Sequence, residues 1–282
     1  RLPPLLEQTR IAAVLGALDD KIELNRQTNQ TLEALAQRLF KSWFVDFDPV
    51  KAKMAGRTPA HMDAETAALF PDRLVESELG LIPEGWEVRE LGALVQNVRD
   101  GVKAEAVPPD VAYVGLEHFE KKSLWLASWG LGNEVTSNKS RFQRGDLLFG
   151  KLRPYFHKVA IAPIDGVCST DVLALRAKEA DFRSYAYLAL FQDEVIDFAT
   201  RTSTGTRMPR ASWKTLATYK IPLPPPPVAR AFAEHCDLWL ERLVHPSSES
   251  RLLAALRDRL LPKLISGQIR VRDAERHVAE VV

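Results

Sequence analysis

Two stretches of the sequence concentrate positive charge and carry few acidic residues. Residues 141–158 contain five basic side chains against Asp146, and residues 201–220 contain five with no acidic residue. The segment KLRPYFHK interleaves cations with aromatic rings, and RTSTGTRMPR places hydroxyl side chains and a glycine among three arginines. Loops of this kind can offer guanidinium groups, hydroxyls and backbone amides to phosphates and base edges. The pattern indicates contact with DNA or, alternatively, an ordinary solvated charged face.

Motifs for catalysis are weak by comparison. The sequence has no phosphate-binding P-loop and no G-x-G-x-x-G, H-E-x-x-H or G-x-S-x-G motif. Asp110, Glu120 and Lys122 satisfy the loose P-D…E-x-K pattern of metal-dependent nucleases, which arises easily by accident in a chain this rich in charge. Cys168 begins the segment CSTD, which is interpreted as a turn leading into a strand. We therefore expect no catalytic residues and no metal site in this chain.

Length and composition narrow the class of protein. The chain has 282 residues, 46% hydrophobic and 27% charged, which predicts a globular protein with more than one structural unit. A net charge of +1 means that any basic surface is local, and two cysteines far apart indicate no disulfide framework. No apolar run is long enough to cross a membrane, so a cytoplasmic location is expected.

The elements that must hold the basic stretches begin with an internal repeat. Shifting the sequence by 221 positions aligns TLEALAQRLFKSWF at 31–44 with LLAALRDRLLPKLI at 252–265 without a gap. Upstream, Leu2-Pro3-Pro4 aligns with Leu223-Pro224-Pro225. A period this long indicates duplication of a whole unit.

The first copy has the spacing of a coiled-coil seam, with steps of three and four. The seam consists of Ile11, Leu15, Leu18, Ile22, Asn25, Asn29, Leu32, Ala36, Leu39 and Trp43. It predicts one helix from about Leu5 to Phe44, started by Pro3-Pro4. The second copy contains Pro246-Ser247-Ser248, which predicts a break or a kink. Amphipathic core helices are the alternative interpretation of both copies.

Between the copies the pattern changes twice. Residues 48–80 are interpreted as a linker with a short helix from Ala64 to Phe70. Residues 81–222 contain short β-rich runs separated by turn residues, and residues 182–199 have the spacing of one helix. The predicted fold class is α+β: a β-rich domain with long coiled-coil spacer helices.

This arrangement resembles the specificity subunits of type I restriction–modification systems. The resemblance covers nearly the whole chain and rests on IPEGWEVRELG, GDLLFGKLRPYFHKVAIA, VCSTDVLALRA, TGTRMPRASWKTLATYKIPLPP and the helical segment from Leu6 to Pro49. It implies a helical spacer at 1–47, a linker at 48–80, a target recognition domain at 81–222, a second helical spacer at 223–270 and a tail at 271–282. The two spacers are expected to pair antiparallel.

The resemblance also implies a function and partners. The chain would be a non-catalytic subunit that recognises double-stranded DNA. Modification (methyltransferase) subunits with S-adenosylmethionine would methylate adenine, and a restriction subunit would use ATP and Mg²⁺ to translocate and cut. This chain itself would hold no cofactor. The residues expected to face DNA are Lys151, Arg153, Tyr155, Lys158, Thr204, Gly205, Thr206, Arg207 and Arg210.

Several alternatives stay open at this point. The order helix, domain, helix and the start at Arg1 suggest either a fragment lacking a first recognition domain or a natural half-subunit that self-associates. Phe40, Trp43 and Phe44 would either contact modification subunits or be buried by their own partner helix. A coiled-coil assembly scaffold without specific DNA readout is the competing function.

Overall fold

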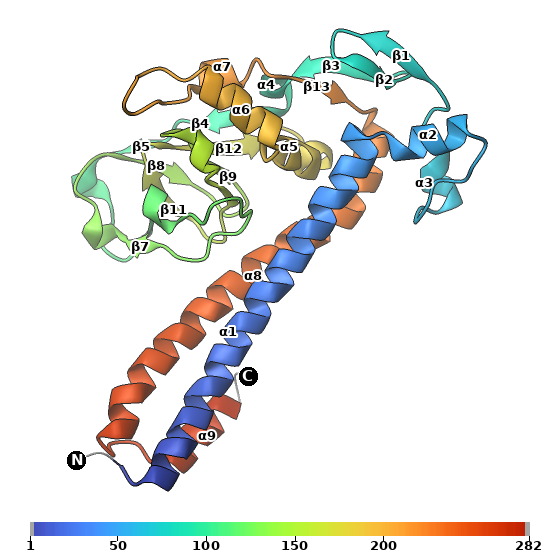
Figure 1. Cartoon of the computed structure of the whole chain (residues 1–282). Helices are drawn as coiled ribbons and strands as arrows, with labels where there is room; N and C mark the ends of the chain where they lie inside the picture. The colour runs from blue at the N-terminus through green and yellow to red at the C-terminus, as the bar shows by residue number, and fades with distance from the viewer. Residues whose placement is uncertain (1–2, 280–282) are drawn as a thin grey trace.

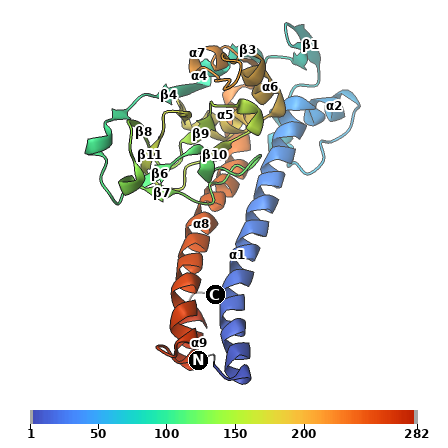
Figure 2. The ribbon, with the colours of Figure 1, turned by 60° about the vertical axis from the view of Figure 1, so that its left-hand side comes forward.

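Two long antiparallel helices carry a mixed α/β domain at one end in the computed structural model (Figure 1), and the helices also lie side by side in a second view (Figure 2). The structure describes residues 3–279, except for the side chains of residues 244–248. Helix α1 spans Leu5–Phe40 and continues as the π-helical turn η1, Lys41–Val45, while α8 spans Pro226–Ile265. The helix predicted from Leu5 to Phe44 and the antiparallel pairing are thus confirmed.

The repeat is visible in how the two helices begin. Pro4 and Pro225, which the shift of 221 aligns, are the N-cap residues of α1 and α8, with φ near −58° and ψ near 150° in both. Proline suits this position because the first amides of a helix have no intrahelical acceptor. Helix α8 runs through the Pro246 region as one helix, so the predicted break into two helices is wrong. Its packing along α1 outweighs the loss of one amide donor.

The seam between the helices has apolar ends and a polar middle. Ile11, Val14 and Leu18 form a cluster with Leu253, Leu260 and Leu264 at the end far from the domain. Asn25, Asn29 and Glu33 are buried in the middle of α1. The two asparagines were predicted there, and Asn25 donates hydrogen bonds from Nδ2 to Glu249 Oε2 (2.8 Å) and Ser250 Oγ (3.3 Å). Glu33 replaces the predicted Leu32 as the buried residue of its turn.

The segment predicted as a tail contains a helix. Helix α9, Val271–Ala279, packs its Val271, Ala274 and Val278 against the start of α1, and Arg10 forms a bidentate ion pair with Glu275. Its apolar residues recur at steps of three and four, so burying them against α1 stabilises the helix. The turn before α9 contains Gly267 at φ +74°.

The domain contains two sheets of short strands. The four-stranded sheet has the order β10-β9-β12-β4, and the five-stranded sheet has the order β5-β8-β11-β6-β7, in which only β11 and β6 are parallel. The strands of these sheets are β4 Val95–Val98, β5 Gly101–Val102, β6 Ala112–Val114, β7 Gly130–Leu131, β8 Lys139–Phe142, β9 Leu147–Gly150, β10 Val159–Ile161, β11 Gly166–Ser169 and β12 Val172–Ala177. Five short turns of 3-10 helix connect them: η2 Ala104–Ala106, η3 Leu116–His118, η4 Gly132–Glu134, η5 Pro154–Phe156 and η6 Ala180–Phe182.

Short helices cover the four-stranded sheet. They are α4 Leu91–Leu94, α5 Arg183–Leu190, α6 Asp193–Arg201 and α7 Trp213–Leu216. The single helix predicted for residues 182–199 is two helices, because Gln192 adopts extended backbone angles and serves as the N-cap of α6. The strands β3 Glu87–Glu90 and β13 Lys220–Leu223 pair antiparallel where the domain joins α8.

Residues 48–80, interpreted from sequence as a linker, hold two short helices and part of a hairpin. Helix α2 spans Asp48–Met54 and α3 spans Ala64–Ala68, close to the short helix predicted there. Strands β1 Leu74–Ser77 and β2 Gly80–Pro83 form the antiparallel hairpin. The helices and the hairpin lie beside the end of α1 (Figure 1).

An aromatic cluster joins α1 to the domain. Phe40, Trp43 and Phe44 are 2–4% exposed. The ring of Phe44 lies 4.7 Å from those of both Tyr185 in α5 and Phe232 in α8. The alternative in which these three aromatics contact another subunit is therefore wrong. The other alternative is correct, because the partner helix α8 buries them, and residues of the domain such as Tyr185 bury them too. No helix in the described residues is long and apolar enough to span a membrane.

Candidate nucleic-acid interface

The structure brings the two basic stretches together through backbone hydrogen bonds. The amide of Arg153 donates to the Pro209 carbonyl (2.7 Å), and that of Ala211 donates to the Lys151 carbonyl (2.9 Å). Leu152 and Arg210 form an antiparallel bridge. Residues 151–158 and 201–211, here called the paired basic loops, thus form one surface although about fifty residues separate them in sequence.

The second of these loops closes on itself as a small hairpin. Thr204 and Arg210 exchange backbone hydrogen bonds of 3.1 and 2.9 Å, and residues 204–208 between them are exposed. Gly205 makes the turn at φ +97°, where a side chain would be strained. The predicted residues Thr204, Gly205, Thr206, Arg207 and Arg210 are therefore all on the solvent side, together with Met208, which is 47% exposed.

Asp171 holds the paired basic loops in place from the turn between β11 and β12. Its backbone carbonyl accepts a hydrogen bond from the Lys151 amide (2.9 Å), and its carboxylate oxygen Oδ1 accepts one from Arg210 Nε (3.0 Å). This hydrogen bond raises the pKa of Arg210 above its usual value. The segment CSTD leads into a strand as predicted, but only Thr170 and Asp171 form the turn, because Cys168 and Ser169 end β11. The role of Asp171 beside the arginine had no sequence signal.

The predicted DNA-facing residues of the first loop differ in how exposed they are. Tyr155 is half exposed, and Lys151 is half buried. Lys158 directs its ammonium inward, donating from Nζ to the Leu116 carbonyl (2.6 Å). Arg153 adopts φ +51°, and its buried Nε has no hydrogen-bond partner. Arg153 and Lys158 therefore shape the loop more than they extend from it.

A further cation lies beside this loop and was missed in the sequence. The ammonium of Lys121 lies 4.7 Å from the centre of the Phe156 ring, a cation–π contact, and Phe156 in turn packs against Tyr155. Lys121 is exposed. Because it comes from the loop before β7, nothing in the local sequence links it to the paired basic loops.

The acidic residue counted within the first basic stretch does not offset this surface charge. Asp146 is 2% exposed and accepts two hydrogen bonds from Arg176, at 2.6 and 2.8 Å. These bonds raise the pKa of Arg176. This half-buried ion pair joins the residue before β9 to β12, so Asp146 is structural.

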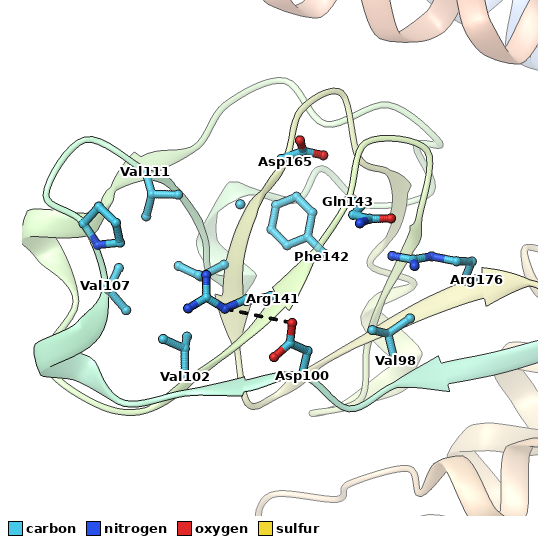
Figure 3. A pocket seen from close by; sticks show the side chains of 13 residues that line it. Val98, Asp100, Val102, Val107, Val111, Arg141, Phe142, Gln143, Asp165 and Arg176 are labelled. Atoms are coloured by element: carbon cyan, nitrogen blue, oxygen red, sulfur yellow. Dashed lines mark ion pairs between the residues drawn. The ribbon is translucent and has the colours of Figure 1, made fainter.

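A pocket of about 310 Å³ lies elsewhere in the domain, against the five-stranded sheet (Figure 3). Its apolar residues include Val98, Val102 and Phe142. Its charged rim is mixed in sign, with Asp100 Oδ2 3.9 Å from Arg141 Nε. Arg141, part of the first basic stretch, thus has a nearby acid and lies outside the paired basic loops.

The residues considered for catalysis are dispersed. Glu120 lines a cavity beside the spacer helices, whereas Asp110 lies in the chain between Pro108 and Val111, which line the other pocket. Among residues 3–279, no three His, Cys, Asp or Glu side chains are grouped to hold a metal ion. Cys168 is fully buried, and burial raises the pKa of its thiol to about 12, so it stays protonated.

Comparison with known families identifies this domain. A family model described as "Type I restriction modification DNA specificity domain" matches residues 83–231, just over half of the chain. The chain belongs to this family. Both paired basic loops of the specificity domain lie within the matched residues.

Curated relatives agree over a longer range. The chain is 26% identical to the type I restriction enzyme HindI specificity subunit of Haemophilus influenzae, over 95% of its own length and 68% of that protein. It is 25% identical to the MjaIX specificity subunit of Methanocaldococcus jannaschii, over 95% of its length and 60% of the relative. The chain thus spans about two thirds or less of each relative.

A solved structure shares the fold. The S subunit of the type I restriction–modification system of M. genitalium superposes with a TM-score of 0.56 at 16% identity, over 93% of this chain and 61% of that one. The two chains therefore share the same overall fold.

Proposed function

We propose that this chain recognises one part of the DNA target of a type I restriction–modification complex, using the paired basic loops of its specificity domain. The observation that carries the proposal is the hydrogen-bonded joining of the two loops, which gathers Tyr155, Arg207 and Arg210 on one exposed surface. Cations beside hydroxyls suit phosphates, and exposed guanidinium groups can read guanine in the major groove.

Catalysis belongs to other subunits in this proposal. Modification subunits would bring S-adenosylmethionine to methylate adenine, and a restriction subunit would use ATP and Mg²⁺ to cleave. The chain itself would be non-catalytic and would work in the cytoplasm, where the DNA is.

Partner subunits need exposed apolar surface on the spacer helices. Leu24 and Leu35 on α1 and Leu238 and Leu252 on α8 are each 43–73% exposed. We propose that modification subunits bind there, in place of the buried aromatics first considered. Self-association of two chains would supply a second specificity domain.

Selection from a randomised duplex library, with the chain purified together with its modification subunit at a fixed near-physiological salt concentration, tests this proposal. The expected result is one enriched motif, or a split motif if two chains associate. Arg207→Ala should lower affinity for that motif about tenfold or more, as for loss of a base contact. Arg272→Ala, an exposed arginine on α9, is the control. No enrichment despite a stable complex would favour the assembly scaffold.

A further inference from the structure

The loop of residues 119–126 bridges the specificity domain and α1. The amide of Leu124 donates to Oε2 of Glu33 (2.8 Å), and the carbonyl of Leu124 accepts from the Ile161 amide in β10 (2.8 Å). Gln37 Nε2 donates to the second carboxylate oxygen of Glu33 (2.8 Å). One peptide segment thus links a buried side chain of the spacer directly to a sheet of the domain.

The same loop is tied to the paired basic loops. The Lys122 amide donates to the carbonyl of His157 (3.0 Å), and the ammonium of Lys122 pairs with Asp193 (2.9 Å). The buried His157 ring has Nδ1 3.2 Å from Asp193 Oδ1, without hydrogen-bond geometry. These groups and Glu33 surround a polar cavity of about 290 Å³. A shift of the loop relative to α1 would therefore reach residues 151–158.

The hydrogen bond of Glu33 holds the domain on α1 at a point away from the main contact between them. The aromatic cluster around Phe44 fixes the domain at the end of α1, about three turns beyond Glu33. Farther from the end of α1, cavities of about 360 Å³ beside Leu240 and about 340 Å³ beside Asn29 lie between the domain and the helices. The polar contacts across this region fall on both helices: on α1 the hydrogen bond of Glu33, and on α8 the ion pairs of Asp237 and Glu241 with Arg183 (3.3 Å each) and the stacking of Arg251 on Trp129 (4.4 Å).

We propose that Glu33 is a positioning residue: by holding the loop of residues 119–126 on α1, it fixes the angle of the specificity domain on the spacer. That angle sets the distance along DNA between the part read by this domain and the part read by a second one. The first part of this inference, that Glu33 fixes the angle of the domain, rests on the contacts of Glu33. The second part, the effect on DNA, rests on the proposed function.

A distance measurement on the full chain tests whether Glu33 fixes the angle of the domain on the spacer. Spin labels are attached to two introduced cysteines at exposed positions, Asp20→Cys on α1 and Asn133→Cys in the domain, and the distance between them reports the angle. The native Cys168 and Cys236 are buried and should not react with the label. Dilution with unlabelled chain removes signals between molecules. We expect a narrow distance distribution for the native residue and for Glu33→Gln, whose amide oxygen can still accept from Leu124. Glu33→Ala should broaden it, and Glu23→Ala on the exposed face of α1 should not.

The consequence on DNA uses the same variants in the selection described above. Glu33→Ala should widen the range of accepted gaps and weaken binding at the preferred gap about tenfold, while affinity for a single part of the target stays unchanged. Glu33→Gln should restore the preference. Glu33→Asp, which keeps the charge but falls short of Leu124, replaces the alanine variant if that fails to fold.

The outcomes separate the two proposals. An unchanged distance distribution in Glu33→Ala overturns the positioning role outright. A broadened distribution with an unchanged gap preference overturns the role in setting the gap. If the native chain selects no DNA, the proposed function fails, and the label distances still decide whether Glu33 holds the domain.

Discussion

The carboxylate of Asp171 lies 3.0 Å from Nε of Arg210, so an acid orients the arginine on the exposed surface of the specificity domain. Asp171→Asn keeps the shape but removes the charge, and it should free Arg210 to bind any phosphate. We expect the ratio of specific to non-specific affinity to fall about tenfold while non-specific binding tightens. Titrating target and scrambled duplexes at one salt concentration measures both. Asp197→Asn, exposed on α6, should leave the ratio unchanged.

Gly205→Ala should disturb the hairpin of the second basic loop. The residue has φ +97°, and an added Cβ would lie 3.2 Å from the carbonyl oxygen of Met208. We expect a stability loss of about 1 kcal/mol and a larger proportional loss of DNA binding, because the strain falls at the proposed DNA-binding surface. Gly56→Ala also has positive φ but meets no neighbouring atom, so it should lose stability without losing DNA binding. Equal binding by both variants would contradict the placement of the interface.

Lys121→Ala tests whether the interface extends beyond the paired basic loops. If Lys121 neutralises one phosphate, the slope of the logarithm of affinity against the logarithm of salt concentration should become shallower by about 0.9. Binding should weaken similarly for all sequences, since a phosphate contact carries no base information. The matched control is Lys103→Ala, an exposed lysine next to Val102 of the 310 Å³ pocket, and a slope equal to the native one would place Lys121 outside the interface.

The pH dependence of stability should carry the signature of Glu33. Burial raises the pKa of Glu33 from 4.5 to about 7, against the opposing hydrogen bonds from Leu124 and Gln37. The folded state therefore binds more protons than the unfolded state between these values. This contribution to stability is fully present below about pH 4.5 and is lost as the pH rises to about 7, amounting to about 3 kcal/mol.

Glu33→Gln isolates that contribution. The surrounding titratable groups are Glu120, Lys122, His157 and Asp193, and burial lowers the pKa of His157, which acts in the opposite direction. Because these groups remain in the variant, the difference in unfolding free energy between the two proteins reports Glu33. Chemical denaturation from pH 5 to pH 8 should show the native protein losing stability relative to Glu33→Gln. A constant difference would mean that Glu33 titrates normally.

Phe44→Ala should be the most destabilising of these changes. Its ring packs against Tyr185 and Phe232 at 4.7 Å and is 2% exposed. Loss of a buried phenylalanine costs about 3–5 kcal/mol, and here the loss falls on the joint between spacer and domain. Urea unfolding followed by circular dichroism measures the effect. Leu24→Ala on the exposed face of α1 should change the unfolding free energy by less than about 0.5 kcal/mol.

The helical part of the fold was largely readable from sequence because periodicity and repetition act locally. The step of three and four predicted α1, the shift of 221 aligned Pro4 with Pro225, and the buried Asn25 and Asn29 followed from the same pattern. The short β-rich runs also became strands. The burial of Glu33 was not predicted because a glutamate on a helix normally faces water. Its burial depends on hydrogen bonds from Gln37 and from the amide of Leu124, and Leu124 lies ninety-one positions away in sequence.

The candidate site was half predictable for a related reason. Charge counts found both basic stretches, but their joining depends on the Arg153–Pro209 and Ala211–Lys151 backbone bonds, to which side chains give no clue. The inward turn of Lys158 follows from the position of the Leu116 carbonyl. Side-chain type therefore located the two basic segments, and tertiary contacts decided that they join and which of their residues face solvent.

We expect the polar middle of the seam to divide the long helix pair into two cooperative units. Asn25, Asn29 and Glu33 separate the aliphatic cluster around Leu18 from the aromatic cluster around Phe44, so the two share little hydrophobic stabilisation. The far end, held by Leu253, Leu260 and α9, can open while the end inside the domain stays folded. Amide hydrogens near Leu18 should then exchange with solvent much faster than those near Phe40. The spacer would thus be rigid where it carries the domain and would open locally at its far end.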